Sequence, residues 1–202
     1  MKCIVRKLKA EINNANLPVF EEVVLKNYIT TTEDGQSIEI PIYHRLDAAK
    51  IEATFELTAL TSGTAVNIVS ISESQIVNAK SSYVRAVNVS DGTLFSVTAN
   101  TEITASIDGS DGSYIINGTS GNCAIPYSGE STREIFSVFK TRLDSYSVQP
   151  AGYVKIKQVK ITDGNNNVYT FKPAEVNGVA VLYDADNGNY YGEVNGGTLL
   201  CG

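Results

Sequence analysis

Apolar and polar residues alternate along much of the chain, most regularly in KIEATFEL at residues 50–57. In an extended strand there, one side would carry lysine, glutamate and threonine, and the other side Ile51, Ala53, Phe55 and Leu57. This period of two is typical of a strand with one face on a core and the other in water. Comparable segments recur from end to end: RKLKAEI, NIVSIS, SYVRAVNV, LFSVTA, EITASI, SYIING, YVKIKQVKI, NVYTFK and VAVLYD.

Turn-forming pairs separate these segments at short intervals. Asp or Asn followed by Gly tolerates the positive φ of tight turns. Such pairs are Asp91-Gly92, Asp108-Gly109, Asp111-Gly112, Asp163-Gly164 and Asn187-Gly188. Many short strands joined by frequent turns predict an all-β, antiparallel two-sheet sandwich. With 202 residues, 43% of them hydrophobic, the chain is long enough for one such domain.

Two irregularities predict local departures from a regular sheet. Pro41 interrupts SIEIPIY, and because proline cannot donate to a ladder, this strand is expected at an edge or to end there. In YVKIKQVKI the apolar parity switches between Ile156 and Val159, so a β-bulge is expected near Gln158.

The segment GESTREIFSVFKTRLD admits two interpretations. Ser131 and Glu134 have capping-box spacing, and Ile135 and Val138 would share a face of a helix. Phe136 is apolar as well, so IFSVF equally fits a fully buried strand. The strand is favoured because its neighbours are all β.

Charge and cysteine usage exclude several classes of site. The net charge of −6 argues against nucleic-acid binding, and the one basic cluster, Lys2, Arg6, Lys7 and Lys9, is expected to be a solvated strand face or a subunit contact.

Cys3, Cys123 and Cys201 are widely spaced, and the chain has a single histidine, so we expect no metal or cofactor. A Cys3–Cys201 disulfide is conceivable if the termini meet, but free thiols in a reducing cytoplasm are favoured. We expect neither a signal peptide nor a membrane span, because charges interrupt the N-terminal segment and no apolar stretch is long enough.

Three strings toward the two ends of the chain carry a further signal. They are NYITTTEDGQSIEI near the start, KIKQVKITDGNNNVYTFKPAEVNG late in the chain and VLYDADNGNYYG almost at the end. The preceding LPVFEEVVLK and the segment at residues 50–57 belong to the same match. Their order and spacing resemble a family of jelly-roll proteins, related in fold to concanavalin-A-like lectins and laminin-G domains, that occurs among phage and prophage structural proteins. The matching positions include Leu17-Pro18, Phe20, Val23, Tyr28-Ile29, Thr31, Gln36, Ile38, Asn177-Gly178, Leu182-Tyr183-Asp184, Gly188, Tyr190-Tyr191 and Gly196-Gly197.

The resemblance covers about the first and last quarters of the chain, whereas residues 58–152 match only in being strand-like. TTEDGQS replaces the tight turn that the family shows, and Tyr190 replaces its usual phenylalanine. On this basis residues 17–202 are expected to form the jelly-roll domain. Residues 1–16 are expected to be either an attachment arm or an ordinary first strand.

The resemblance implies a non-enzymatic structural protein of the virion, assembled in the bacterial cytoplasm, at the tail tip, in a tail or head fibre, or decorating the head. The implied partners are other virion proteins and further copies of the chain, with a trimer favoured. Host-surface glycans are a further implied ligand. The alternatives are a glycan-active enzyme or accessory carbohydrate-binding module, and a pure assembly protein that binds no sugar.

Residues 109–122, GSDGSYIINGTSGN, have the ingredients of a sugar site. Such sites combine polar side chains for the hydroxyl groups with an aromatic ring for the C–H face of the sugar. The candidate carbohydrate-binding residues are Asp111, Tyr114, Asn117 and Asn122. A long hairpin loop has the same composition.

Two other motifs favour ordinary structural roles. Asp184, Asp186 and Asn187 imitate the start of a calcium loop, but Asn195 stands where the final Glu would be required, so a hairpin turn is expected. His44 has no recognisable catalytic setting and is expected in a surface loop.

Overall fold

The computed structural model describes residues 4–9, 19–44, 49–58, 65–71, 74–80, 83–86, 95–122, 134–139, 151–194 and 197–202. These residues form strands and turns with no helix among them, and every strand pairing is antiparallel. The prediction of an all-β, antiparallel fold is therefore confirmed. None of the described residues forms a helix long and apolar enough to cross a membrane.

Within the described ranges, the larger sheet contains twelve strands. Eight of them form a path in the order β1-β2-β15-β14-β5-β10-β11-β12, and β3, β16, β17 and β18 branch from it. Their bounds are β1 Ile4–Lys9, β2 Val19–Leu25, β3 Ile29–Thr30, β5 Lys50–Leu57, β10 Glu102–Asp108, β11 Ser113–Ile116, β12 Thr119–Asn122, β14 Val154–Thr162, β15 Val168–Val176, β16 Val179–Asp184, β17 Tyr190–Tyr191 and β18 Leu200–Cys201.

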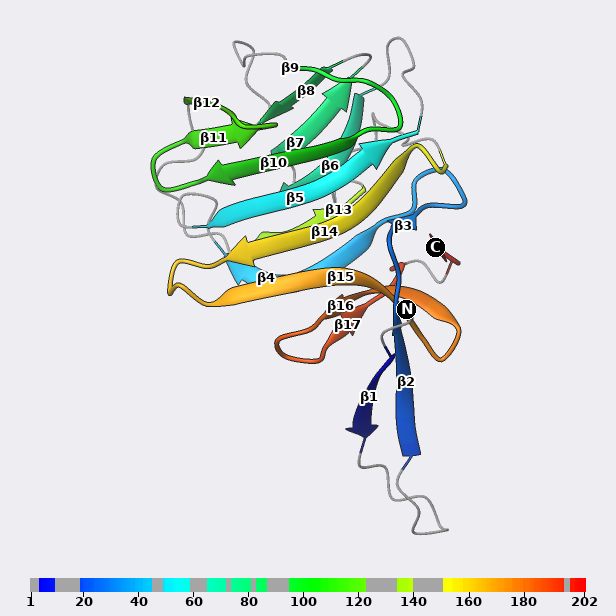
Figure 1. Ribbon diagram of the computed structural model, residues 1–202. Coiled ribbons are helices and arrows are strands. Elements are labelled where there is room, and N and C mark those ends of the chain that lie inside the picture. The colour runs from blue at the N-terminus through cyan, green and yellow to red at the C-terminus, as the bar shows by residue number, and fades with distance from the viewer. Residues whose placement is uncertain are drawn as a thin grey trace.

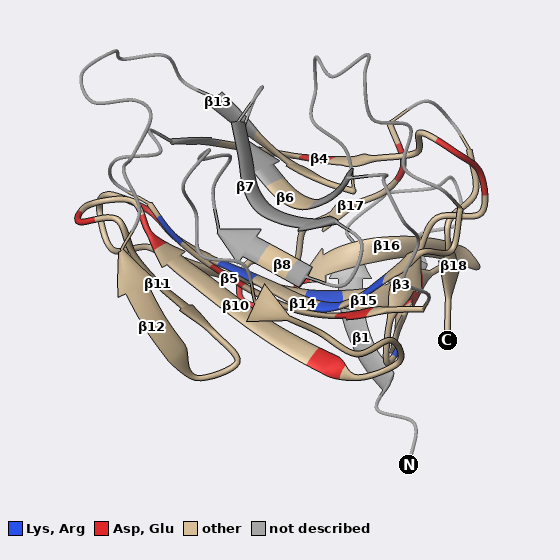
Figure 2. Cartoon of the chain, turned by 90° about the horizontal axis from the view of Figure 1, so that it is seen from above, with Lys and Arg blue, Asp and Glu red and all other residues tan. Residues whose placement is uncertain are grey.

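The described part of the chain gives the smaller sheet six strands, in the order β4-β13-β6-β7-β8-β9. Their bounds are β4 Ile38–His44, β6 Ala65–Ile71, β7 Ser74–Lys80, β8 Tyr83–Ala86, β9 Phe95–Ser96 and β13 Glu134–Val138. The two sheets form two layers, with β4 on one side and β5, β10 and β14 on the other (Figures 1 and 2). Buried side chains of both sheets, such as Phe55 and Phe136, belong to one core cluster between the layers, as in a β-sandwich.

The alternation along β5 decides which side chains enter that core. Ile51, Ala53, Phe55 and Leu57 are all buried, and the residues between them are more exposed, as predicted. β10 repeats the pattern with its own buried residues Ile103, Ala105 and Ile107. The outer face of the larger sheet is consequently lined with polar side chains.

The predicted bulge lies in β14. Ile156 pairs with Phe55 and Gln158 pairs with Thr54, so Lys157 is an extra residue on β14. The bulge lets Ile156 and Val159 both point into the core despite their odd spacing.

Both predictions for the smaller sheet are confirmed. β4 is its first strand in the pairing order, and Pro41 within it is exposed, as expected of an edge strand. Residues 134–138 form strand β13 between β4 and β6, and Phe136 and Ser137 on its two faces are both buried. The helical interpretation of this segment is therefore wrong for these residues.

The N-terminal strands form a hairpin that extends away from the two layers (Figure 1). β1 pairs with β2 from Val19 to Val24, whereas β15 pairs with β2 from Val23 to Leu25. Within the described part of the chain, the first half of β2 therefore has β1 as its sole strand neighbour. The division into an arm of residues 1–16 and a domain of residues 17–202 stays a prediction.

Several predictions concern residues that lie outside the described ranges. These residues include Lys2, Cys3, Asp91-Gly92 and Cys123. Cys201 is described, is half-buried and carries a free thiol.

Candidate functional site

The outer face of the larger sheet carries paired charges at both ends of its central strands. At one end, Lys160 Nζ lies 2.9 Å from Glu52 Oε2 across β14 and β5. At the other end, Lys157 Nζ lies 3.0 Å from Glu102 Oε2 and 3.5 Å from Glu56 Oε2. The hydrogen bond to Glu102 raises the pKa of Lys157, so this lysine stays cationic and its charge offsets that of the glutamates.

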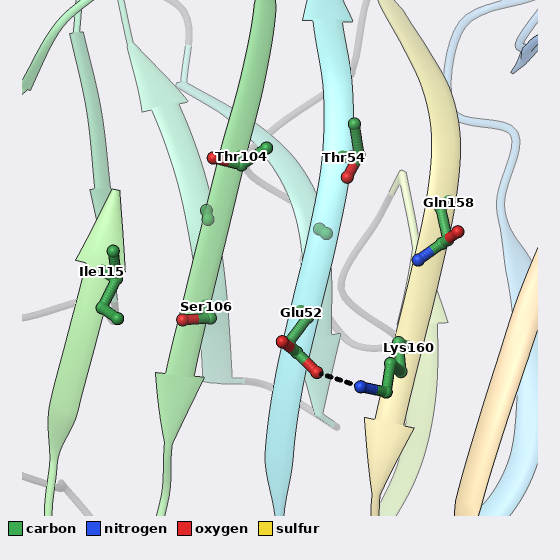
Figure 3. A pocket seen from close by; sticks show the side chains of 9 residues that line it. Glu52, Thr54, Thr104, Ser106, Ile115, Gln158 and Lys160 are labelled. Carbon is green, nitrogen blue, oxygen red and sulfur yellow. Dashed lines mark ion pairs between the residues drawn. The ribbon is translucent and has the colours of Figure 1, made fainter. Parts of the chain in front are cut away.

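A row of uncharged polar side chains crosses the sheet between these charged groups. Gln158 of β14 is opposite Thr54 of β5, which is opposite Thr104 of β10. The three side chains lie on the same face of neighbouring strands (Figure 3). Amide and hydroxyl groups both donate and accept hydrogen bonds, so the row can satisfy a neutral polar ligand.

The row borders a shallow pocket of about 300 Å³. The residues that line it are Glu52, Ala53, Thr54, Thr104, Ala105, Ser106, Ile115, Gln158 and Lys160. The second row of this pocket runs from Lys160 through Glu52 and Ser106 to Ile115, each opposite the next across neighbouring strands. The pocket therefore passes from an ion pair at one end to an exposed apolar side chain at the other (Figure 3).

The charged groups of the lining form one ion pair. Glu52 is the single carboxylate among the nine lining residues, and it is held by Lys160. A glycosidase of the usual kind needs two carboxyl groups that flank the bond to be broken. The described residues also contain no group of three or more His, Cys, Asp or Glu side chains that could hold a metal ion.

The structure does not gather the four residues predicted as a sugar site in one place. Asp111 lies in the turn between β10 and β11, where Ser113 N donates to its carboxylate at 2.8 Å. Hydrogen bonds from Ser113 lower the pKa of Asp111. Asn122 pairs with Ser113 at this end of β11, whereas Asn117 lies in the turn at the other end and accepts a hydrogen bond from Thr104 N at 3.0 Å.

Tyr114 is a core residue and does not offer an exposed ring. Its side chain is 4% exposed and meets Phe95 edge-on with the ring centroids 5.7 Å apart. Alternation along β11 turns Tyr114 and Ile116 inward and Ile115 outward. The placement of Asp111, Tyr114, Asn117 and Asn122 does not provide the expected stacking surface, and glycan binding by these residues stays a prediction.

The segment that imitates a calcium loop is a hairpin turn between β16 and β17, as predicted. The buried Asp184 accepts hydrogen bonds from Asp186 N at 3.1 Å and Asn187 N at 3.3 Å. Asn187 Nδ2 donates to its second oxygen at 2.8 Å. The carboxylate therefore stabilises the turn.

In the turn between β14 and β15, an aspartate carboxylate likewise accepts hydrogen bonds from backbone N–H groups. Asp163 accepts hydrogen bonds from Asn165 N and Asn167 N, both at 2.8 Å. Burial, followed by the charge of Asp163 and a hydrogen bond to it, raises the pKa of Tyr169.

His44 lies at the last position of β4, opposite Glu134 of β13. The prediction that it lies in a surface loop is therefore wrong. The sequence did not predict the outer-face pocket, because the residues that line it have the pattern of an ordinary solvated strand face. A usable signal existed in β5, where Thr54 is an uncharged outward residue between Glu52 and Glu56.

Comparison with known proteins gives no assignment: no protein-family model matches the chain, and no curated protein sequence matches it.

Proposed function

We propose that this protein is a non-enzymatic binding module that holds a neutral glycan on the outer face of its larger sheet, as a structural component of a phage particle. The observation that carries the binding role is the uncharged row of Gln158, Thr54 and Thr104 between paired charges. Sugar hydroxyls need donors and acceptors close together, and this row supplies both. The pocket beside it, of about 300 Å³, has room for a few sugar units at most.

The virion role rests on the resemblance to phage-type jelly-roll proteins in the first and last quarters of the chain. Two facing antiparallel sheets agree with a jelly roll of the concanavalin-A-like class, which we propose as the fold type. In a particle, several copies of a weak site bind together, because linked sites greatly increase the overall affinity. We propose a trimer as the assembled state.

The extended β1–β2 hairpin supports a role in attachment to another virion protein. It leaves the two-layer body on the side where β2 meets β15 (Figure 1). In the backbone register, Arg6 is opposite Glu22 and Lys7 is opposite Glu21. The hairpin and the outer-face pocket are built from different strands, so attachment and glycan binding can proceed together.

Binding of immobilised neutral oligosaccharides tests the proposed function. Thr104→Lys places a long charged side chain in the pocket and is expected to abolish binding while the protein stays folded. Thr119→Lys is the matched control, because Thr119 is an exposed threonine on β12 outside the pocket lining. Absence of binding by the unchanged protein, or equal binding by both variants, would contradict the proposal.

A further inference from the structure

Ile115 gives the pocket an apolar end. Its side chain is 48% exposed although it belongs to a well-formed strand, and its neighbours Tyr114 and Ile116 are buried. The two alanines of the lining, Ala53 and Ala105, are each only 3% exposed and belong to the core. Ile115 is therefore the apolar side chain that the pocket presents to a ligand (Figure 3).

A hydroxyl group stands beside this apolar side chain. Ser106 of β10 is directly opposite Ile115 of β11. Side chains opposite each other on one face of an antiparallel pair have Cβ atoms about 5 Å apart. A ligand group that contacts both can therefore carry a polar atom and an apolar atom a few ångströms from each other.

We propose that the pocket selects a sugar with an acetamido group, with the methyl on Ile115 and the amide at Ser106; this inference rests on the proposed glycan binding. The acetamido group joins a methyl to an amide that both donates and accepts. Ser106 can pair with either end of that amide, since a hydroxyl is a donor and an acceptor. The lining contains no aromatic ring, so the compact methyl replaces ring stacking as the apolar contact.

The charged end of the pocket determines whether the neighbouring sugar unit can carry a charge. Glu52 is opposite Ser106 on the other side, and its carboxylate is paired with Lys160. Because Lys160 is already paired with Glu52, the lining offers no unpaired cation to the carboxylate of an acidic sugar. The site therefore favours neutral acetamido sugars over sugars that carry a carboxylate.

A matched pair of trisaccharides tests the selection: β-1,4-linked N-acetylglucosamine and β-1,4-linked glucose, measured by calorimetric titration. The N-acetyl trisaccharide is expected to bind more tightly. Ile115→Ser is expected to reduce this preference about fourfold, the effect of losing one buried methyl contact. Val168→Ser is the control, because Val168 is 43% exposed on β15 and outside the lining.

Saturation-transfer NMR on the unchanged protein provides a readout that does not depend on any variant. The acetamido methyl is expected to receive the strongest saturation of all ligand protons. Equal affinity for the two trisaccharides, or a methyl signal no stronger than that of the ring protons, would overturn the acetamido inference and leave glycan binding intact. Binding of neither sugar, nor of any other neutral oligosaccharide, would overturn the proposed function itself.

Discussion

At the scale of single residues, the contact between Gly121 of β12 and Tyr114 of β11 restricts which side chain can stand at position 121. A Cβ atom added at Gly121 would collide with the Tyr114 hydroxyl and its ring. Tyr114 cannot move aside easily, because its ring is buried against Phe95. Packing thus requires glycine at position 121. Although the sequence TSGN of β12 is polar, its glycine contacts a core residue.

We predict that Gly121→Ala lowers the free energy of unfolding by about 1–3 kcal/mol, the usual cost of overpacking. Chemical denaturation monitored by tyrosine fluorescence measures the change. Ser120→Ala, at an exposed position of the same strand, is expected to change stability by less than about 0.5 kcal/mol. Equal effects of the two substitutions would refute the packing argument.

The half-buried Tyr191 should make the fold sensitive to alkaline pH. Burial, then the charge of Asp184 and the proximity of Tyr169, raises its pKa. The pKa of Tyr191 in the folded state lies above the unfolded value of about 10. Its contribution to the free energy of unfolding is therefore complete below about pH 10 and is lost as pH rises through the folded pKa. We predict that Tyr191→Phe reduces the loss of unfolding free energy between about pH 8 and about pH 11.

Tyr190→Phe is the control for this measurement, because Tyr190 is adjacent on β17 and more exposed. All three proteins have the same lysines, so the effects of the lysines cancel in the comparison. An identical pH dependence for the unchanged protein and the Tyr191 variant would show that burial of this hydroxyl is unimportant.

At the scale of elements, alternation along β11 assigns opposite roles to two adjacent isoleucines. Ile116 is fully buried in the core, whereas Ile115 faces the pocket. We predict that Ile116→Ala costs about 2–5 kcal/mol of unfolding free energy and that Ile115→Ala costs less than about 0.5 kcal/mol. Denaturant titration of both variants checks this. Comparable losses would mean that β11 is not oriented as described.

Patterns within a strand were predictable from the sequence, and contacts between strands were not. KIEATFEL fixes the buried side of β5, and the parity switch at Gln158 locates the bulge of β14, because side-chain direction depends on local spacing alone. The neighbours of β5, by contrast, are β10 and β14, the latter about 100 residues further along the chain. The row of Thr54, Thr104 and Gln158 exists only once these strands pair.

The predicted sugar loop shows how composition misleads. Residues 109–122 were chosen for their glycine, serine and asparagine content and for Tyr114, yet the same alternation that identified other strands also applies to SYII. Applied there, it would have turned Tyr114 inward and Ile115 outward. Composition describes a solvated hairpin equally well, whereas side-chain direction identifies the surface that a ligand can reach.

At the scale of the whole molecule, the proposed trimer and the extended β1–β2 hairpin make one prediction together. We predict that the full chain sediments as a trimer, and that removal of residues 1–18 abolishes assembly with its virion partner while glycan binding per chain is unchanged. Analytical ultracentrifugation and a binding assay on the same samples measure both properties. Loss of glycan binding on truncation would mean that the hairpin supports the pocket.

The location of a bound glycan tests the central claim most directly. A crystal structure of the protein with the β-1,4-linked N-acetylglucosamine trisaccharide is expected to show the sugar across β14, β5 and β10. Its hydroxyls should contact Gln158, Thr54 and Thr104. A sugar bound instead at the turns around Asp111 and Asn117, or at another surface of the molecule, would contradict the account.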